Sequence, residues 1–174
     1  GLLEEIKVIT KSEERNRSIV TKLKVVYREL EGKYERTKKD YGPLEESIEN
    51  FFVKIDKNFK KFETFMDKND YVSVEKVVVN LENEIDTLKD YLERTPDLVL
   101  IATLMIPNKI EETKTMYSRM QRDGFPLDYL NIEYNIKEIE EKVATILEKL
   151  KNFDIGKSDV ELKTMLEYFN TIFN

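Results

Sequence analysis

The chain contains no cysteine, histidine or tryptophan, and only 5 glycines and 4 prolines occur among its 174 residues. Without thiolate or imidazole groups, the sequence excludes zinc sites built on those ligands, a cysteine nucleophile, a histidine base and a histidine-containing di-iron bundle. We therefore predict no enzymatic activity, no cofactor and no catalytic or metal-binding residue. Because glycine and proline are scarce, turns should be few and long regular elements should dominate.

Charged residues make up 37% of the chain and hydrophobic residues 40%, which is enough to form a buried core. The net charge of -6 and the pI of ≈ 5.0 argue against a nucleic-acid partner. No window reaches the roughly 18 apolar residues that a membrane-spanning helix needs. Because an amphipathic pattern is already in phase just after Gly1, we expect Gly1 to be a cloning remnant and the chain to be a fragment of a longer protein.

The first long segment carries one apolar stripe with the period of an α-helix. Its members are Ile19, Leu23, Val26, Leu30, Tyr34, Tyr41, Leu44, Ile48, Phe51, Ile55, Phe59, Phe62 and Met66, with Thr37 filling one gap. The mean spacing of about 3.6 residues predicts one helix over about residues 3–67. Because the stripe keeps its phase across Tyr41-Gly42-Pro43, we expect a kink there rather than a turn. Polar residues 67–70 should end this helix and cap the next.

A second stripe, from Val74 to Met120, predicts a helix over about residues 71–122 that contains Pro96 and Pro107. The prolines stand about three helical turns apart, so we expect both to kink the helix on nearly the same face. An alternative is that Thr95 caps a new helix whose first residue is Pro96. We favour a kinked, nearly continuous helix.

Gly124 suits a left-handed helix cap, and together with Phe125 and Pro126 it predicts the clearest turn in the chain. A third stripe then predicts a helix over about residues 130–173, interrupted near Gly156. Short connections make neighbouring helices antiparallel, so we predict an all-α fold with one elongated antiparallel three-helix bundle over residues 1–174. Helices of about 50 residues would extend roughly 75 Å.

Three carboxylate clusters invite a metal-binding or acid–base interpretation: Glu45-Glu46-Glu49, Glu82-Glu84-Asp86 and Glu138-Glu140-Glu141. They lie largely off the apolar stripes, where pKa values stay ordinary, so we interpret them as solvated helix faces. A basic run could instead bind nucleic acid or anionic lipid: Lys54, Lys57, Lys60 and Lys61. Asp56 and Glu63 interrupt that run and weaken this interpretation. Phe52 and Phe65 fall beside the stripe and could widen the buried face or form a contact surface.

An ordered set of motifs resembles the septation ring formation regulator family, EzrA. The set consists of Tyr27-Arg28-Glu29-Leu30, Tyr41-Gly42-Pro43-Leu44-Glu45, Asn69-Asp70-Tyr71, Leu92-Glu93-Arg94-Thr95-Pro96-Asp97-Leu98, Ile106-Pro107 and Asp123-Gly124-Phe125-Pro126-Leu127-Asp128-Tyr129. In that family, a helix with two prolines at this interval ends in a glycine-aromatic turn before a third helix. The resemblance covers roughly residues 12–174. The helix breaks and this ordered set together give the following turn or kink positions: Tyr71, Pro96, Pro107, Gly124, Phe125 and Gly156. Phe125 and Tyr129 depart from the tyrosine and histidine that the family pattern leads us to expect.

The resemblance implies spectrin-like triple-helical repeats in a scaffold or regulator of bacterial cell division. It also implies binding to the tubulin-like protein FtsZ and to other divisome proteins, with restraint of ring assembly away from midcell. The location implied is the cytoplasmic side of the membrane at the division septum, through a single-pass anchor that this chain lacks. Two alternatives stay open: an amphipathic protein that binds lipid surfaces, and a generic spectrin-like or coiled-coil spacer.

Overall fold

The computed structural model describes residues 1–125 and 129–173, and every element within these ranges is helical. The all-α prediction is therefore confirmed. Pro126, which the sequence analysis placed in a turn, lies outside the described residues. The chain divides into two compact units, the first made of Gly1–Lys38 and Glu45–Glu93 and the second of Lys39–Leu44 and Arg94–Asn174.

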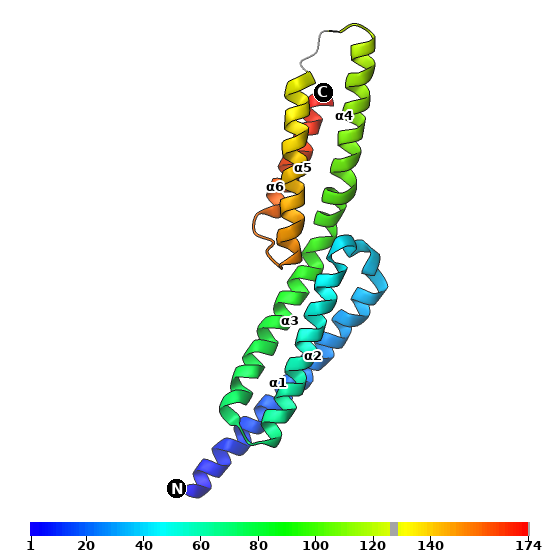
Figure 1. Cartoon of the computed structure of the whole chain (residues 1–174). Coiled ribbons are helices and arrows are strands. Elements are labelled where there is room, and N and C mark those ends of the chain that lie inside the picture. Colours follow the sequence, from blue (N-terminus) through cyan, green and yellow to red (C-terminus); the bar gives the residue numbers. More distant parts are fainter. Residues whose placement is uncertain (126–128, 174) are drawn as a thin grey trace. The chain divides into compact units, whose positions relative to one another are not determined.

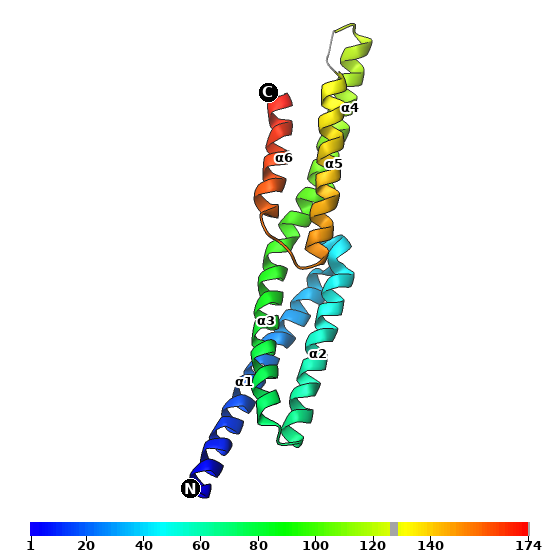
Figure 2. The ribbon, with the colours of Figure 1, turned by 60° about the vertical axis from the view of Figure 1, so that its left-hand side comes forward.

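Unit 1 consists of three helical segments packed side by side: α1 (Leu2–Thr37), α2 (Glu45–Asp67) and the first part of α3 (Tyr71–Leu100) (Figures 1 and 2). Helices α1 and α2 are antiparallel, since Arg17 pairs with Glu63 whereas Lys38 pairs with Glu49. Helix α3 contacts both of them through polar pairs, Asn16 with Glu75 and Asn58 with Glu84. The buried side chains of the three segments form one apolar core.

The predicted single helix over residues 3–67 is wrong. Helix α1 ends at Thr37, a short 3-10 segment η1 (Lys38–Leu44) follows, and α2 begins at Glu45 in the opposite direction. Gly42 has φ 47° and ψ -117°, a backbone conformation that only glycine adopts at low cost. The next residue, Pro43, has no N–H to donate to a continuing helix. Together they turn the chain instead of kinking the helix.

Helical conformation is uninterrupted from Tyr71 to Arg122, through α3, a π-helical turn η2 (Ile101–Met105) and α4 (Ile106–Arg122). Pro96 lies inside α3, so a new helix does not begin there. Helix α4 begins directly after the π-helical turn, and Pro107 is its second residue. Because Pro107 cannot donate a backbone hydrogen bond and its ring crowds the preceding turn, the wider π-helical backbone accommodates it.

Unit 2 contains α4, α5 (Tyr129–Lys151) and α6 (Ser158–Phe173), with Lys114 of α4 4.0 Å from Glu140 of α5. Asn135 donates a hydrogen bond of 3.0 Å to the Tyr168 hydroxyl, so the early part of α5 lies beside the late part of α6. The expected interruption near Gly156 is therefore a second reversal of the chain. With two reversals more than the sequence analysis expected, the chain forms two units instead of one three-helix bundle.

Apart from the two prolines, the turn positions singled out from the sequence lie at helix ends or connections. Tyr71 is the first residue of α3, and Gly156, with φ 50°, lies between α5 and α6. Gly124, with φ 82°, follows the last turn of α4, and the Phe125 N–H donates to the Met120 carbonyl over 3.1 Å. This is a Schellman cap, which satisfies carbonyl groups that the end of a helix leaves without partners.

Asp70 caps the start of α3, as the sequence analysis expected for residues 67–70. Its carboxylate accepts hydrogen bonds from the Ser73 hydroxyl over 2.7 Å and from the Ser73 backbone N–H over 3.2 Å. These hydrogen bonds lower the pKa of Asp70, because they stabilise the ionised form. The cap satisfies one of the backbone donors that a helix start leaves without a partner.

Candidate interaction surfaces

An aromatic seam holds α1 and α2 together in unit 1. The Tyr27 ring lies 5.6 Å from that of Phe52 and 5.4 Å from that of Phe59, and the Tyr34 ring lies 5.5 Å from that of Phe52, measured between centroids. The Tyr27 hydroxyl donates to Asp56 Oδ1 over 2.8 Å. Burial, and then the hydrogen bond to Asp56, raises the pKa of Tyr27, so this residue stays protonated and serves as a donor.

Along one side of this seam, a shallow surface between the two helices is here called the α1–α2 groove. Its first part, the basic end, is a cavity of about 350 Å³ lined by Lys24, Tyr27, Arg28, Asp56, Phe59 and Lys60. The Lys24 ammonium lies 5.7 Å from the centroid of the Phe59 ring, within reach of a cation–π contact. Three cationic side chains therefore face one carboxylate, which already accepts the Tyr27 hydrogen bond.

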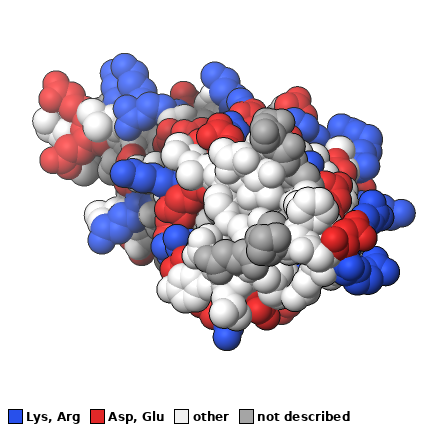
Figure 3. All heavy atoms as spheres, turned by 90° about the horizontal axis from the view of Figure 1, so that it is seen from above, with Lys and Arg blue, Asp and Glu red and all other residues white. Residues whose placement is uncertain are grey.

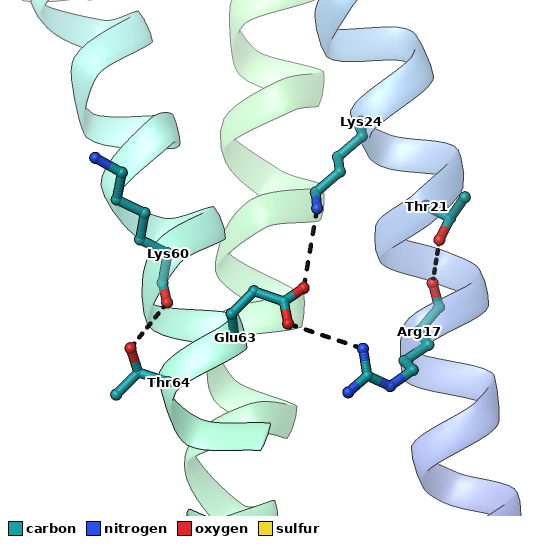
Figure 4. Close-up of polar contacts among 6 residues, drawn as sticks. All are labelled: Arg17, Thr21, Lys24, Lys60, Glu63 and Thr64. Atoms are coloured by element: carbon teal, nitrogen blue, oxygen red, sulfur yellow. Dashed lines mark hydrogen bonds and ion pairs between the residues drawn. The ribbon is translucent and has the colours of Figure 1, made fainter. Parts of the chain in front are cut away.

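Figure 4 shows how the basic end continues toward the start of α1. Glu63 of α2 reaches across to α1, where its carboxylate oxygens lie 3.8 Å from Arg17 and 3.9 Å from Lys24. The Lys60 side chain extends away from Glu63. These pairs are long and exposed, so each contributes little to stability. Among the described residues, neither Arg28 nor Lys60 lies within 4.0 Å of a carboxylate in the ion pairs at the basic end.

The second part of the groove, the acidic end, is a cavity of about 120 Å³ lined by Glu31, Tyr34, Glu35, Glu49 and Phe52. Lys38 compensates part of this negative charge, since its ammonium lies 3.0 Å from Glu49. Burial raises the pKa of Glu31, and the nearby charges of Asp56 and Glu35 raise it further. The two ends of the groove thus carry opposite charge.

This groove could not be predicted from the sequence, because its charges come from two helices that share one apolar stripe and were expected to form a single helix. A partial signal was present: Lys24, Arg28, Glu31 and Glu35 recur in steps of four, three and four residues, so they share one helix face. Of the basic run on α2, Lys60 alone lines the groove cavities. Lys54 instead lies 5.5 Å from the centroid of the Phe51 ring.

Glu84 is the exception among the carboxylate clusters, because its side chain is only 8% exposed whereas Glu82 and Asp86 are exposed. One carboxylate oxygen accepts a hydrogen bond from Asn58, and the other, Oε2, has no hydrogen-bond partner in the part of the chain that is described. Burial raises the pKa of Glu84, although Lys54 opposes that effect. Glu84 stands three residues after Leu81 and four before Leu88, and this helical spacing indicates a position on the buried face.

Replacing Glu84 with glutamine is expected to stabilise the protein at pH 7 by about 1 kcal/mol, because an amide is less costly to bury than a carboxylate with an oxygen left unpaired. Burial raises the pKa of Glu84 in the folded protein above its value of about 4.3 in the unfolded chain. Protonated Glu84 therefore stabilises the folded state fully below about pH 4.3, and this stabilisation is lost as the pH rises through the folded-state pKa. The gain should therefore disappear near pH 4. Urea denaturation at both pH values measures it.

Glu82→Gln is the matched control, since Glu82 is exposed on the same helix. We expect no change in stability for that variant at either pH. An equal gain from both substitutions would mean that general charge reduction, and not the burial of Glu84, is responsible.

A second polar cluster joins α1 to α3. The Glu75 carboxylate accepts hydrogen bonds of 3.0 Å from Ser12 Oγ and from Asn16 Nδ2, and lies 3.7 Å from the Arg15 guanidinium. The hydrogen bonds from Asn16 and Ser12 lower the pKa of Glu75. Asn16 is only 3% exposed, so this contact satisfies a buried amide and fixes how α1 and α3 are aligned.

Unit 2 carries two further surfaces. A groove of about 650 Å³ lies between α5 and α6, with Ile146 and Met165 among its apolar residues and Glu138 and Lys149 among its charged ones. The end of the unit where α4 finishes and α5 begins gathers uncharged side chains inside a charged rim (Figure 3). Exposed apolar residues at this end include Phe125, Leu130 and Tyr134.

The described residues contain neither a candidate metal site nor a candidate membrane-spanning helix. Among residues 1–125 and 129–173, no three carboxylates come together as a group that could hold a metal ion. None of the helices in these ranges is both long and apolar enough to cross a membrane.

Comparison with known proteins identifies relatives over the full length of the chain. The family model described as septation ring formation regulator, EzrA, matches residues 1–174. Proteins named septation ring formation regulator EzrA are 22% identical over 99% of this chain in Geobacillus sp. strain WCH70, 24% over 99% in Bacillus velezensis, and 18% over 91% in Staphylococcus epidermidis. The matched segments cover 30%, 31% and 28% of those relatives. No solved structure matches at a significant level.

Proposed function

Because this chain belongs to the septation ring formation regulator family, EzrA, we propose that it acts in bacterial cell division as a non-enzymatic helical scaffold that regulates assembly of the septation ring. The observation that carries the proposal is the family match over all of residues 1–174. The chain spans about three tenths of the length of the relatives named above, so the partners of a whole family member are extended to it here by inference.

The partner that we propose is FtsZ, together with other divisome proteins, and the effect is restraint of FtsZ ring assembly. The site of action would be the cytoplasmic side of the membrane at the septum, reached through a membrane anchor outside these residues. We further propose that each compact unit corresponds to a spectrin-like three-helix element. Unit 1 supports this, because α1, α2 and α3 pack side by side around one apolar core.

The chemistry of the chain supports a scaffold over an enzyme. Scaffolds act by holding surfaces in fixed positions, and long helices with buried aromatic seams supply that rigidity. The charged groove between α1 and α2 is shallow and lined by lysine, arginine and carboxylate side chains, which suits reversible recognition of charged protein surfaces.

FtsZ polymerisation tests the proposal directly. FtsZ from a Gram-positive bacterium is polymerised with GTP, with and without an excess of this chain, and polymer mass is followed by light scattering and by sedimentation. We expect the chain to sediment with FtsZ polymers and to lower the amount of polymer.

The same mixture with GDP in place of GTP is the control, since it separates binding to polymers from aggregation of either protein. If polymer mass stays unchanged and the chain remains in the supernatant at every ratio, direct regulation of FtsZ is the wrong function for these residues.

A further inference from the structure

The α1–α2 groove of unit 1 is electrically polarised along its length. Lys24, Arg28 and Lys60 line the basic end, whereas Glu31, Glu35 and Glu49 line the acidic end. On α1, the four charged residues occupy one face, because they recur in steps of three and four. A partner for the whole groove therefore needs the reverse polarity: negative against the first end and positive against the second.

The positions of these charges are related by a single two-fold operation. If two α1 helices run antiparallel with their crossing point between Glu29 and Leu30, Lys24 of one helix faces Glu35 of the other and Arg28 faces Glu31. Antiparallel α2 helices that cross between Lys54 and Ile55 bring Lys60 opposite Glu49 in the same way. Three pairs of opposite charge thus follow from one arrangement.

The two crossing points also lie at the same level of the α1–α2 hairpin. The hydrogen bond from Tyr27 to Asp56 fixes which residues stand opposite each other within unit 1. Because α1 and α2 are antiparallel, each residue forward from Tyr27 along α1 corresponds to one residue backward from Asp56 along α2. The crossing point on α1 therefore lies opposite residues 53 and 54 of α2. The crossing point on α2 is therefore displaced by only about one residue, or about 1.5 Å of helix rise. One two-fold axis can accommodate both helix pairs.

From this geometry we propose that the α1–α2 groove binds a second copy of this chain, packed antiparallel so that the basic end of each copy faces the acidic end of the other. A parallel arrangement would bring like charges together, and repulsion between them opposes it. The antiparallel contact is isologous, with the same surface used on both copies, and it closes as a dimer. The inference rests on the charges of unit 1 and not on the proposed function.

The association should be weak and sensitive to salt. Exposed ion pairs contribute about 0.2 to 1 kcal/mol each, and salt screens them. Val53, near the crossing point on α2, is 50% exposed in the single chain, so only half of a small side chain remains to be buried by association. The apolar contribution at the centre of the contact is therefore modest. We therefore expect a monomer–dimer equilibrium whose dissociation constant rises at least about tenfold between low salt and about 0.5 M NaCl.

Sedimentation equilibrium of the 174-residue chain, combined with charge reversal at each end, tests the proposal. One variant carries Lys24→Glu and Lys60→Glu, and the other carries Glu35→Lys and Glu49→Lys. Each variant alone should be monomeric where the unaltered chain dimerises, because like charges then meet at both contacts. An equimolar mixture of the two should associate again as a 1:1 complex, because the substituted positions then face side chains of opposite charge, and Arg28 still faces Glu31.

Control variants place the same changes of net charge on exposed positions of α3: Lys76→Glu with Lys89→Glu, and Glu82→Lys with Asp86→Lys. These should dimerise as the unaltered chain does. The proposal is overturned if the unaltered chain is monomeric in low salt at the highest concentration reached, if the groove variants dimerise normally, or if their mixture stays monomeric. Circular dichroism establishes that every variant is folded.

The absence of cysteine from the chain provides a test of the register. A variant with Lys24→Cys and Glu35→Cys should form a disulfide-linked dimer on oxidation, since the arrangement brings these positions together between copies. The two positions are eleven residues apart on one helix, or about 16 Å, which is too far for an intramolecular disulfide. The control, Lys24→Cys with Lys76→Cys, should remain monomeric. Equal cross-linking of both variants would refute the antiparallel register.

Discussion

Replacing Phe52 with alanine is expected to lower the free energy of unfolding by about 3 to 5 kcal/mol, the range for removal of a buried aromatic ring. The Phe52 side chain is 8% exposed and its ring contacts those of Tyr27 and Tyr34. Alanine would leave a cavity in the seam between α1 and α2, and the rigid rings around it would collapse only partly. Urea denaturation followed by circular dichroism measures the loss.

Phe51→Ala is the matched comparison, because it removes the same ring one residue earlier. Phe51 is half-buried and lies beneath the Lys54 ammonium near the surface. We expect a loss of about 1 kcal/mol for that variant, of the size of an exposed cation–π contact and some apolar burial. The apolar stripe read from the sequence includes Phe51 and leaves Phe52 beside it. The reverse order of effects would therefore favour the continuous helix and contradict the structure.

Replacing Gly42 with alanine is expected to destabilise the protein by about 2 kcal/mol or more. The backbone conformation at Gly42, φ 47° and ψ -117°, strains any residue with a Cβ atom. A Cβ atom there would also lie 3.3 Å from Val99 Cγ1, so a neighbour in the same unit would have to move. Both costs act on the folded state, and thermal denaturation should show them as a lower Tm.

Gly124→Ala is the comparison for a glycine at positive φ without a close neighbour. Gly124 also has a positive φ, 82°, but a Cβ atom added there would meet nothing within 4 Å. We expect a loss of about 1 kcal/mol from the backbone conformation alone. The excess loss at Gly42 then measures the contact with Val99 together with the added strain of its ψ of -117°, and equal losses at both positions would show that neither is costly.

The sequence alone was sufficient to predict helical conformation, a cap among residues 67–70 and the location of the connections after α2 and α4. These features are local: apolar spacing, a carboxylate ahead of a helix and a glycine behind one act within a few residues. The reversal at Gly42 could not be found in the same way. A hydrophobic stripe records which side of a helix is buried, and it carries no information on whether the chain continues forward or turns back after a break.

The consequence of that missed reversal extends to the candidate groove. Lys60 forms the basic end of the groove together with Lys24 and Arg28, which stand more than thirty positions earlier in the chain. Only a hairpin brings them together. Glu84 was missed for another reason: its charge favoured an exposed position, whereas its spacing from Leu81 and Leu88 favoured a buried one. In the structure Glu84 is buried against α2, where Asn58 donates a hydrogen bond to it, as the spacing indicated.

The π-helical turn at Ile101–Met105 bears on how this chain is compared with its relatives. Ile101 and Ile106 stand five positions apart and both are buried, a separation that an ordinary α-helix would place on different sides. A π-helical turn is equivalent to one residue inserted into an α-helix. Proteins that lack the inserted residue can therefore share the same helix, and an alignment that is correct on both sides of this turn has to open a one-residue gap inside it.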